Sequence, residues 1–377
     1  MRVIIASDSF KGSLSSREVA DAFTEGFIRH YPKCEIVKVE IADGGEGTVE
    51  SLISNLGGEV IDVLVADPLG RPITARYGVI KELKTAVIEM SSASGLPLLK
   101  DEERNPMLTT TYGTGEIIAD AIQRGCRKFL MGIGGSATND AGVGMLRALG
   151  FRFLDNEGRE LRDGGEILEQ IHKIDDSHIC KELTECEFTV ACDVTNPLYG
   201  KEGAAYIFAP QKGATPEMVA LLDKGLQNFA RVIEEFNGVQ LHDMEGAGAA
   251  GGLGGGMAAL LGAKLKRGID MVLDVIQFDR MIEGSDLVIT GEGCIDHQTI
   301  MGKAPSGVLK AATKQGIPTI AIGGSVVWCE ELRSSGFAAI EVCTPEGMPL
   351  DEAMNPTTAK ENIIRTAKRI AQRFMTD

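Results

Sequence analysis

Short apolar runs, each followed by a helical pattern, occur at both ends of the chain and constrain its fold more than any other feature. Residues 2–7 (RVIIAS) have the length and composition of a buried strand, and apolar side chains at helical spacing follow over 15–29. The same order of strand and helix continues at 35–41 and 47–55. Such alternation predicts a parallel sheet whose strands are connected by helices.

The alternation returns near the C-terminus. Three apolar runs predict further strands, and two helical patterns lie between or after them; the strands are expected at 286–290, 319–322 and 338–342, and the helices at 305–314 and 358–374. The five strands from the two ends are therefore expected to form one doubly wound sheet, because chain termini commonly lie close together in one domain.

The middle of the chain has a different pattern. Strand-like runs at 59–66, 73–79 and 86–90 are joined by short turns, which favours antiparallel pairing. We therefore predict two α/β domains. Residues 1–60 and 282–377 form the parallel-sheet domain, and residues 61–281 form an inserted second α/β domain with a mixed sheet.

Charge and hydropathy exclude several classes of partner. The formal net charge of −16 gives no general attraction to nucleic acid or to an anionic membrane. The longest uncharged stretch, 246–263, is too rich in glycine to cross a membrane. The apolar run at the N-terminus is too short for a signal peptide, so a cytoplasmic location is predicted.

The spacing of the cysteines predicts no zinc site. The eight cysteines form no C-x-x-C pair, and none is spaced with the five histidines as in zinc sites. They are expected to be reduced and mostly buried thiols.

Five polar segments, four of which contain glycine, stand out, and most of them lie directly after a predicted strand. Their sequences are DSFKGS from Asp8, DGGEGT from Asp43, GIGGSATND from Gly132, CDVTNPL from Cys192, and TGEGCIDHQT from Thr290, the last followed by Gly302 and Lys303. One such segment alone is typical of any turn between strand and helix. Five together favour a ligand site, because glycine admits close approach and helix N-termini bind anions.

Other nucleotide motifs are weak or absent. A G-x-G-x-x-G match at Gly246, Gly248 and Gly251 has no convincing strand before it, so a dinucleotide site is improbable. That run is expected either to face a phosphate or to allow tight helix packing. Lys303 is followed by Ala304 rather than Ser or Thr, which excludes a P-loop. His297 is the only histidine inside a polar segment, and no catalytic triad is evident.

Taken together, these segments resemble the bacterial glycerate kinase family that makes 2-phosphoglycerate (glycerate 2-kinase, type 1). The match includes DSFKGS at Asp8, ADGGEGT at Ala42, GIGGSATNDAG at Gly132 and ACDVTNPL at Ala191, and it extends to GKAPSGV at Gly302. The resemblance implies a flavodoxin-like domain with an inserted α/β domain. It also implies an ATP-dependent kinase that uses Mg²⁺ and D-glycerate.

We assign roles to individual residues from what phosphoryl transfer requires. The reaction needs cations on the phosphates, a metal held by carboxylates and a group that orients the attacking hydroxyl. The expected catalytic residues are Asp193, which orients the hydroxyl, Lys11 and Asp8. The expected metal ligands are Asp43, Glu292 and Asp296, with Asp8 as a further candidate. The expected substrate- and phosphate-binding residues are Ser9, Gly134, Gly135, Ser136, Thr138, Asn139, Lys212, Gln298 and Lys303.

Two rival functions stay open at this point. A non-catalytic binder of small acids would also carry glycine loops, although it would not need so many carboxylates near an anionic ligand. A nicotinamide dehydrogenase would depend on the weak glycine match alone. The phosphorylated hydroxyl and the choice between monomer and homo-oligomer also stay open.

Overall fold

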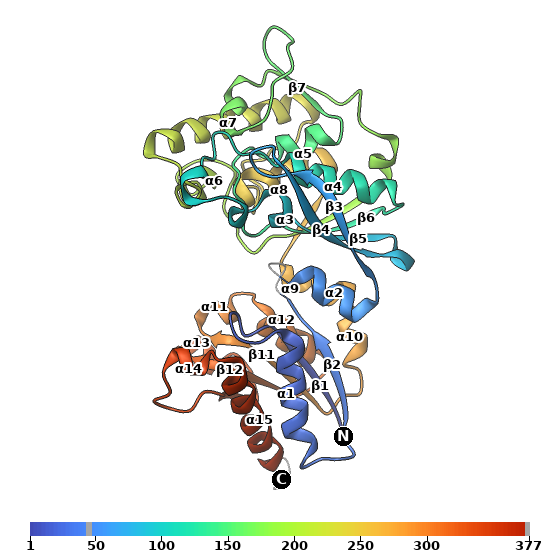
Figure 1. The fold of residues 1–377 in the computed structure, drawn as a ribbon, viewed down its shortest axis with the longest axis vertical. Helices are drawn as coiled ribbons and strands as arrows, with labels where there is room; N and C mark the ends of the chain where they lie inside the picture. Colours follow the sequence, from blue (N-terminus) through green and yellow to red (C-terminus); the bar gives the residue numbers. More distant parts are fainter. Residues whose placement is uncertain (43–46, 374–377) are drawn as a thin grey trace. The chain divides into compact units, whose positions relative to one another are not determined.

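The computed structural model describes residues 1–42 and 47–373, and it divides into two compact units. Unit 1 contains Met1–Asp43, Ser54–Leu56 and Gly268–Asp377, and unit 2 contains Gly44–Ile53 and Gly57–Arg267. Both are labelled by their elements in Figure 1.

Unit 1 contains a sheet of five parallel strands. These are β1 (Arg2–Ser7), β2 (Glu35–Glu40), β11 (Leu287–Ile295), β12 (Thr319–Val326) and β13 (Ala339–Val342). Their spatial order is β13-β12-β11-β1-β2, and every neighbouring pair is parallel. This is the flavodoxin-like order, in which the first strand lies between the second and third. The predicted fold class is confirmed, including a sheet built from both chain ends.

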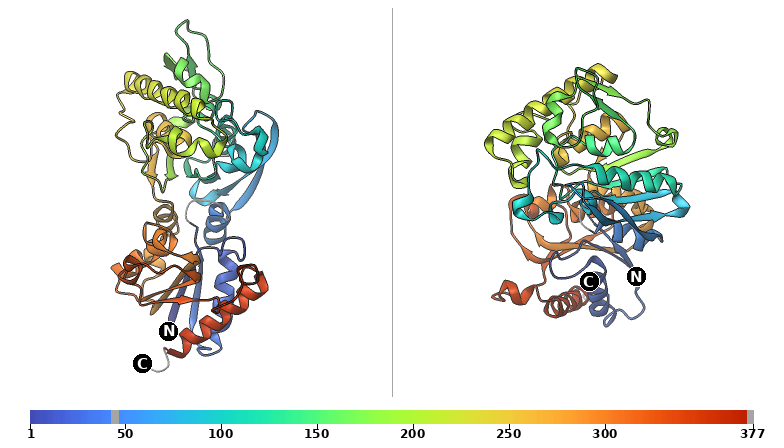
Figure 2. Two further views of the ribbon diagram at one scale, coloured as in Figure 1. Left: turned by 90° about the vertical axis from the view of Figure 1, so that its left-hand side faces the viewer. Right: turned by 45° about the horizontal axis from the view of Figure 1, so that its top comes forward.

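Helices cover the two faces of the unit 1 sheet. They are α1 (Ser16–Ile28), α9 (Gly268–Val275), α10 (Phe278–Met281), α11 (His297–Ile300), α12 (Ala304–Lys314), α13 (Glu330–Arg333), α14 (Leu350–Ala353) and α15 (Pro356–Arg373). Figure 2 shows α15 on one side of the sheet and the orange helices on the other.

Alternating side chains of β1 explain why both faces of this sheet are covered. Val3 and Ile5 join the core under α1 and α15, which includes Phe23 and Ile363. Ile4 points to the opposite face and is equally inaccessible to solvent. A strand buried on both faces is expected to be continuously apolar, as this one is.

The start of α1 follows from its sequence. The Ser15 hydroxyl accepts a hydrogen bond from the Glu18 amide, and the Glu18 carboxylate accepts one from the Ser15 amide. This capping box fixes where the chain turns from the polar segment after β1 into the helix.

Unit 2 is built on a mixed sheet of six strands with the order β10-β9-β6-β5-β4-β3. The strands of this sheet are β3 (Glu59–Ala66), β4 (Pro72–Ile80), β5 (Thr85–Glu89), β6 (Lys128–Gly132), β9 (Glu187–Ala191) and β10 (Lys264–Lys266). A separate two-stranded sheet is formed by β7 (Arg152–Leu154) and β8 (Lys173–Asp175). The pairs β3–β4 and β4–β5 are antiparallel, as predicted, and β5, β6, β9 and β10 are parallel.

The helices of unit 2 surround one large core. They are α3 (Ser91–Ser94), α4 (Tyr112–Gln123), α5 (Val143–Ala148), α6 (Ala204–Phe208), α7 (Pro216–Asn237) and α8 (Leu253–Leu261), and α2 (Thr48–Leu56) divides between the two units. Phe129 of β6 and Phe188 of β9 stack at 4.7 Å in this core.

The structure differs from the sequence-based division at both boundaries. Unit 2 includes Gly44–Ile53 and continues from Gly57, rather than beginning at residue 61. Unit 2 ends at Arg267 rather than at residue 281. The reason is that α9 packs on α12 of unit 1, where a Cβ on Gly307 would lie 2.4 Å from the Ile269 side chain. Helix α9 therefore belongs to unit 1.

Two further details were not predicted. Strand β11 extends to Ile295, beyond the predicted end at residue 290, because its glycine-containing half still pairs with β12 through Cys294 and Ser325. Glu292 therefore lies within a strand rather than in a loop. Strands β7, β8 and β10 have three residues each, which is too short for a recognisable period.

The cysteines, all of them in the described part of the chain, are free thiols, but the prediction that they are mostly buried is wrong. Only Cys126 and Cys343 are buried, while Cys180 and Cys294 are exposed. Among the described residues, no helix combines the length and apolar character needed to cross a membrane.

Candidate functional site

The predicted site residues fall into two groups, one in each unit. In unit 1 they gather around a pocket of about 460 Å³ at the carboxyl ends of β1, β11, β12 and β13. Its lining includes Asp8, Ser9, Lys11, Glu292, Asp296 and Lys303. Parallel strands end at the same edge of a sheet, which is where open α/β sheets bind ligands.

Asp8 and Glu292 are brought together by the pairing of β1 with β11. The Asp8 amide donates to the Gly291 carbonyl over 2.9 Å, and the Ser7 hydroxyl donates to the same oxygen over 3.0 Å. Asp8 is therefore fixed beside the residue that precedes Glu292. Both side chains are nearly buried, with 6% and 8% exposure.

Glu292 is an acid whose charge is partly compensated. Burial raises the pKa of Glu292, whereas the Thr299 hydroxyl and the Lys303 ammonium oppose that rise. Thr299 donates to Oε1 over 2.6 Å, and the Lys303 Nζ lies 3.5 Å from Oε2. Because one oxygen is held by each partner, the carboxylate of Glu292 has a fixed orientation at the pocket.

Asp296 has a structural role in addition to lining the pocket. It is the N-cap of α11, and its Oδ1 accepts hydrogen bonds from the amides of Gln298 and Thr299. Both bonds reach Oδ1, which leaves Oδ2 for another partner. Asp296 can therefore cap the helix and still offer an oxygen to a ligand.

The segment after β1 folds into a tight loop over the pocket. The Phe10 amide donates to the Leu14 carbonyl over 2.8 Å, and Gly12 has a φ of 77° that favours glycine. The Ser13 hydroxyl is buried and has no hydrogen-bond partner among the described residues. Since an unsatisfied buried hydroxyl costs roughly 1–3 kcal/mol, Ser13 is a candidate to bind a polar group in the pocket.

Part of the pocket lining is apolar. It is formed by side chains of the loop after β1 and of the region from β13 to α14, namely Phe10, Cys343, Met348, Leu350, Ala353 and Met354. The pocket lining therefore combines apolar side chains, which suit a flat apolar group, with three carboxylates and the ammonium groups of Lys11 and Lys303.

In unit 2, the candidate residues follow two neighbouring strands. Gly132 at the end of β6 pairs with Ala191 at the end of β9. The segments that begin at Ile133 and Cys192 therefore leave the same sheet edge from strands roughly 4.8 Å apart. Asp193 is exposed at this edge, as are Gly134 and Gly135.

Lys212 is buried beneath the segment after β6. Its Nζ donates to the Ser136 hydroxyl over 2.7 Å and to the Thr138 carbonyl over 2.6 Å. Only 2% of the residue is exposed, and burial lowers the pKa of Lys212 to about 7, an effect that the charge of Asp140 partly opposes. An ammonium carries three donors, so one remains for a ligand.

Two further side chains in this segment have unsatisfied polar atoms. Oγ1 of Thr138 and both amide atoms of Asn139 are buried without a hydrogen-bond partner among the described residues. Both residues are fully inaccessible to solvent. Unpaired polar groups beside a buried lysine indicate a binding site for an anion or a hydroxylated molecule.

Asp140 holds this segment in place. Its carboxylate accepts hydrogen bonds from the amide and hydroxyl of Thr111 and from the amides of Gly142 and Gly144, at 2.8–3.2 Å. Burial raises the pKa of Asp140, and these four bonds oppose that rise. The segment, including Ala141 at a φ of 52°, is thereby constrained to one conformation.

The glycine-rich run from Gly246 packs tightly beneath the same segment. A Cβ on Gly251 would lie 2.1 Å from the Thr138 carbonyl oxygen, and one on Gly256 would lie 2.0 Å from that of Ala141. The Ala141 amide donates to the Gly251 carbonyl over 3.0 Å. These contacts favour tight packing over a phosphate-facing loop for this run.

Most of the predicted residues are therefore placed at one of two sheet edges. Two are not: Asp43 lies outside the described residues, and Gln298 is exposed on α11 and does not line the pocket. The sequence-based selection omitted Ser13, Thr299 and Asp140, although each lies inside a polar segment or next to one. The apolar side chains around Met348 and Met354 had no sequence signal.

Comparison with known proteins gives a consistent result. The model of the glycerate kinase family matches residues 3–375. "Glycerate kinase" of Bacillus subtilis (strain 168) is 47% identical over 372 residues, covering 98% of this chain and 97% of the relative. "Glycerate 2-kinase" of Escherichia coli (strain K12) is 45% identical over 373 residues, with 98% and 97% covered.

A solved structure supports the same relationship. The crystal structure of a Salmonella typhimurium LT2 protein assigned as glycerate kinase 2 is similar with a TM-score of 0.91 and 43% sequence identity. The similarity covers 100% of this chain and 98% of that one.

The role of Asp140 leads to a stability prediction. In Asp140→Asn, the amide group must face at least one of the backbone donors that the carboxylate now accepts. We expect the free energy of unfolding to fall by about 1–3 kcal/mol, measured by urea denaturation. Asp176→Asn, at an exposed position of unit 2, is the control and should change it by less than about 0.5 kcal/mol. An Asp140→Asn protein as stable as the wild type would contradict this role.

Proposed function

Since this chain belongs to the glycerate kinase family, we propose that it transfers the γ-phosphoryl group of ATP to D-glycerate and produces 2-phosphoglycerate and ADP. The name of the Escherichia coli relative, glycerate 2-kinase, supports the choice of the 2-hydroxyl.

The observation that carries the proposal is the composition of the unit 1 pocket. The apolar side chains of Phe10, Leu350 and Met354 suit the base of a nucleotide, and the ammonium groups of Lys11 and Lys303 suit its phosphates. Lys303 directly precedes α12, and the positive end of the dipole of this helix adds to the attraction for an anion. We assign ATP to this pocket, with the Ser13 hydroxyl as a further phosphate partner.

The acid substrate is assigned to the segment after β6 in unit 2. A hydroxy acid offers a carboxylate and hydroxyls, which match the remaining donor of Lys212 and the unpaired groups of Thr138 and Asn139. The exposed backbone of Gly134 and Gly135 can donate to the same carboxylate. A bound carboxylate would favour the charged form of Lys212, which burial disfavours in the free protein.

Asp193 is assigned to the attacking hydroxyl. It is exposed at the carboxyl edge of β9, beside the strand whose following segment we assign to the acid. A carboxylate there can accept the hydroxyl proton as the phosphoryl group is transferred.

The pocket also fits Mg²⁺. This ion prefers oxygen ligands and keeps several waters, and Asp8, Glu292 and Asp296 provide carboxylates in the pocket lining. Oδ2 of Asp296, which the helix cap does not use, is one such oxygen. When bound, Mg²⁺ would neutralise charge on the phosphates. Asp43 remains a proposed ligand on the sequence alone.

The first test is the identity of the product. We expect full-length protein with ATP, Mg²⁺ and D-glycerate to produce a phosphorus resonance of 2-phosphoglycerate, with an equal amount of ADP. Glycerol should give little turnover because it lacks the carboxylate, and chelation of Mg²⁺ should stop the reaction. A 3-phosphoglycerate signal would refute the choice of hydroxyl. Binding of glycerate without consumption of ATP would instead indicate a non-catalytic acid-binding protein.

The second test concerns Asp193. Asp193→Asn preserves the size of the side chain and removes the proton acceptor, so turnover should fall roughly 10²–10⁴-fold while the affinity for ATP is nearly kept. Steady-state kinetics and nucleotide titration measure the two quantities, and Asp176→Asn is the control. An equally large loss of ATP affinity would show that Asp193 binds the metal or the nucleotide instead.

A further inference from the structure

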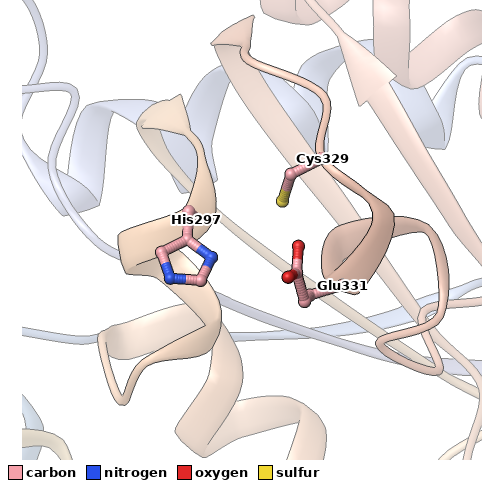
Figure 3. A group of neighbouring side chains, drawn as sticks. All are labelled: His297, Cys329 and Glu331. Carbon is pink, nitrogen blue, oxygen red and sulfur yellow. The ribbon is translucent and has the colours of Figure 1, made fainter.

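Three potential metal ligands of different chemistry converge on the surface of unit 1. His297, Cys329 and Glu331 each offer one ligand atom, and these atoms lie within 4.8 Å of one another. Figure 3 shows the imidazole, the thiol and the carboxylate directed toward a common space. His297 is the first residue of α11, Cys329 precedes α13, and Glu331 is its second residue.

The backbone that carries these ligands is well fixed. Thr299 of α11 is fully buried and donates to Glu292, while Leu332 of α13 is fully buried in a small core with Ile295. The Val327 amide donates to the Ile295 carbonyl over 2.8 Å, which joins the segments that follow β11 and β12. The ligands therefore project from two short helices whose positions do not depend on a bound ion.

The spacing requires only a small adjustment for metal binding. Zinc bond lengths of about 2.0–2.3 Å with tetrahedral angles place ligand atoms roughly 3.3–3.6 Å apart. His297 and Glu331 are exposed, so rotation of their side chains can bring the ligand atoms the remaining distance of about 1 Å closer together.

We propose that His297, Cys329 and Glu331 form a binding site for a divalent transition-metal ion of the Zn²⁺ class, with water in the fourth position. Nitrogen and thiolate ligands suit Zn²⁺ or Co²⁺ and do not suit Mg²⁺, which prefers oxygen. This site is therefore chemically distinct from the carboxylates of the pocket, and it does not depend on the proposed kinase function.

Occupancy would have a consequence for the neighbouring pocket. His297 follows Asp296 directly, and both Asp296 and Ser325 of β12 line the pocket. A metal ion held by α11 and α13 would join the segments that carry these two residues.

Cobalt absorption tests the site directly. Co²⁺ is titrated into reduced, metal-free, full-length protein. We expect one equivalent to bind, with a near-ultraviolet sulfur-to-cobalt charge-transfer band and the visible bands of a tetrahedral ion. Zn²⁺ should displace the Co²⁺, whereas a large excess of Mg²⁺ should not.

Matched variants identify the ligands. Cys329→Ser should abolish the charge-transfer band, and His297→Gln and Glu331→Gln should each raise the Co²⁺ dissociation constant at least about tenfold. Cys180→Ser, His178→Gln and Glu330→Gln change exposed residues of the same types and should leave binding unchanged. The proposal is overturned if wild-type protein shows no band, if the band survives in Cys329→Ser, or if Mg²⁺ displaces the cobalt.

Discussion

The parallel pairing of β1 with β11 is the constraint on which the unit 1 pocket depends. It joins Ser7 to Gly291, residues 284 positions apart in the chain, through the hydrogen bonds of Ser7 and Asp8 to one carbonyl. Because parallel strands end at the same edge, this pairing places the loop after β1 beside Glu292. The acidic and cationic groups of the pocket therefore come from opposite ends of the sequence, and neither end could form the pocket alone.

The candidate site of unit 2 depends on a different constraint, which acts on the segment after β6. The segment after β6 carries Ser136, Thr138 and Asn139, and it must hold buried polar atoms in fixed positions without satisfying all of them. Asp140 constrains it through four hydrogen bonds, and the glycine-rich run supports it from beneath at a distance that excludes side chains. The energetic cost of these unpaired groups is the physical reason to expect a ligand there.

Much of this organisation could be predicted from the sequence, because it depends on local patterns. The apolar runs near Val3, Val37, Val288, Ile320 and Ile340 predicted the five strands of the sheet. Asp8, Glu292 and Lys303, which come from the polar segments after two of these strands, line one pocket. The end of β11 was not predictable, since a strand rich in glycine has no apolar period and is defined only by its partner β12.

The features that depend on distant contacts were also missed. The burial of Lys212 and its bonds to Ser136 and Thr138 join residues more than 70 positions apart. The cluster of His297, Cys329 and Glu331 has no zinc-site spacing in the sequence, so spacing alone indicated no zinc site. It is the packing of α11 near α13 that brings these residues together.

The central claim is that the nucleotide binds to unit 1 and the hydroxy acid to unit 2. Hydrogen exchange measured by mass spectrometry tests it most directly, on full-length protein alone, with Mg²⁺ and ADP, and with D-glycerate added to that mixture. The account predicts that Mg²⁺ and ADP slow exchange at residues 8–14 and 291–303, and that glycerate then slows it at residues 133–140. Protection of residues 133–140 by the nucleotide alone, with glycerate acting only on the unit 1 segments, would contradict it.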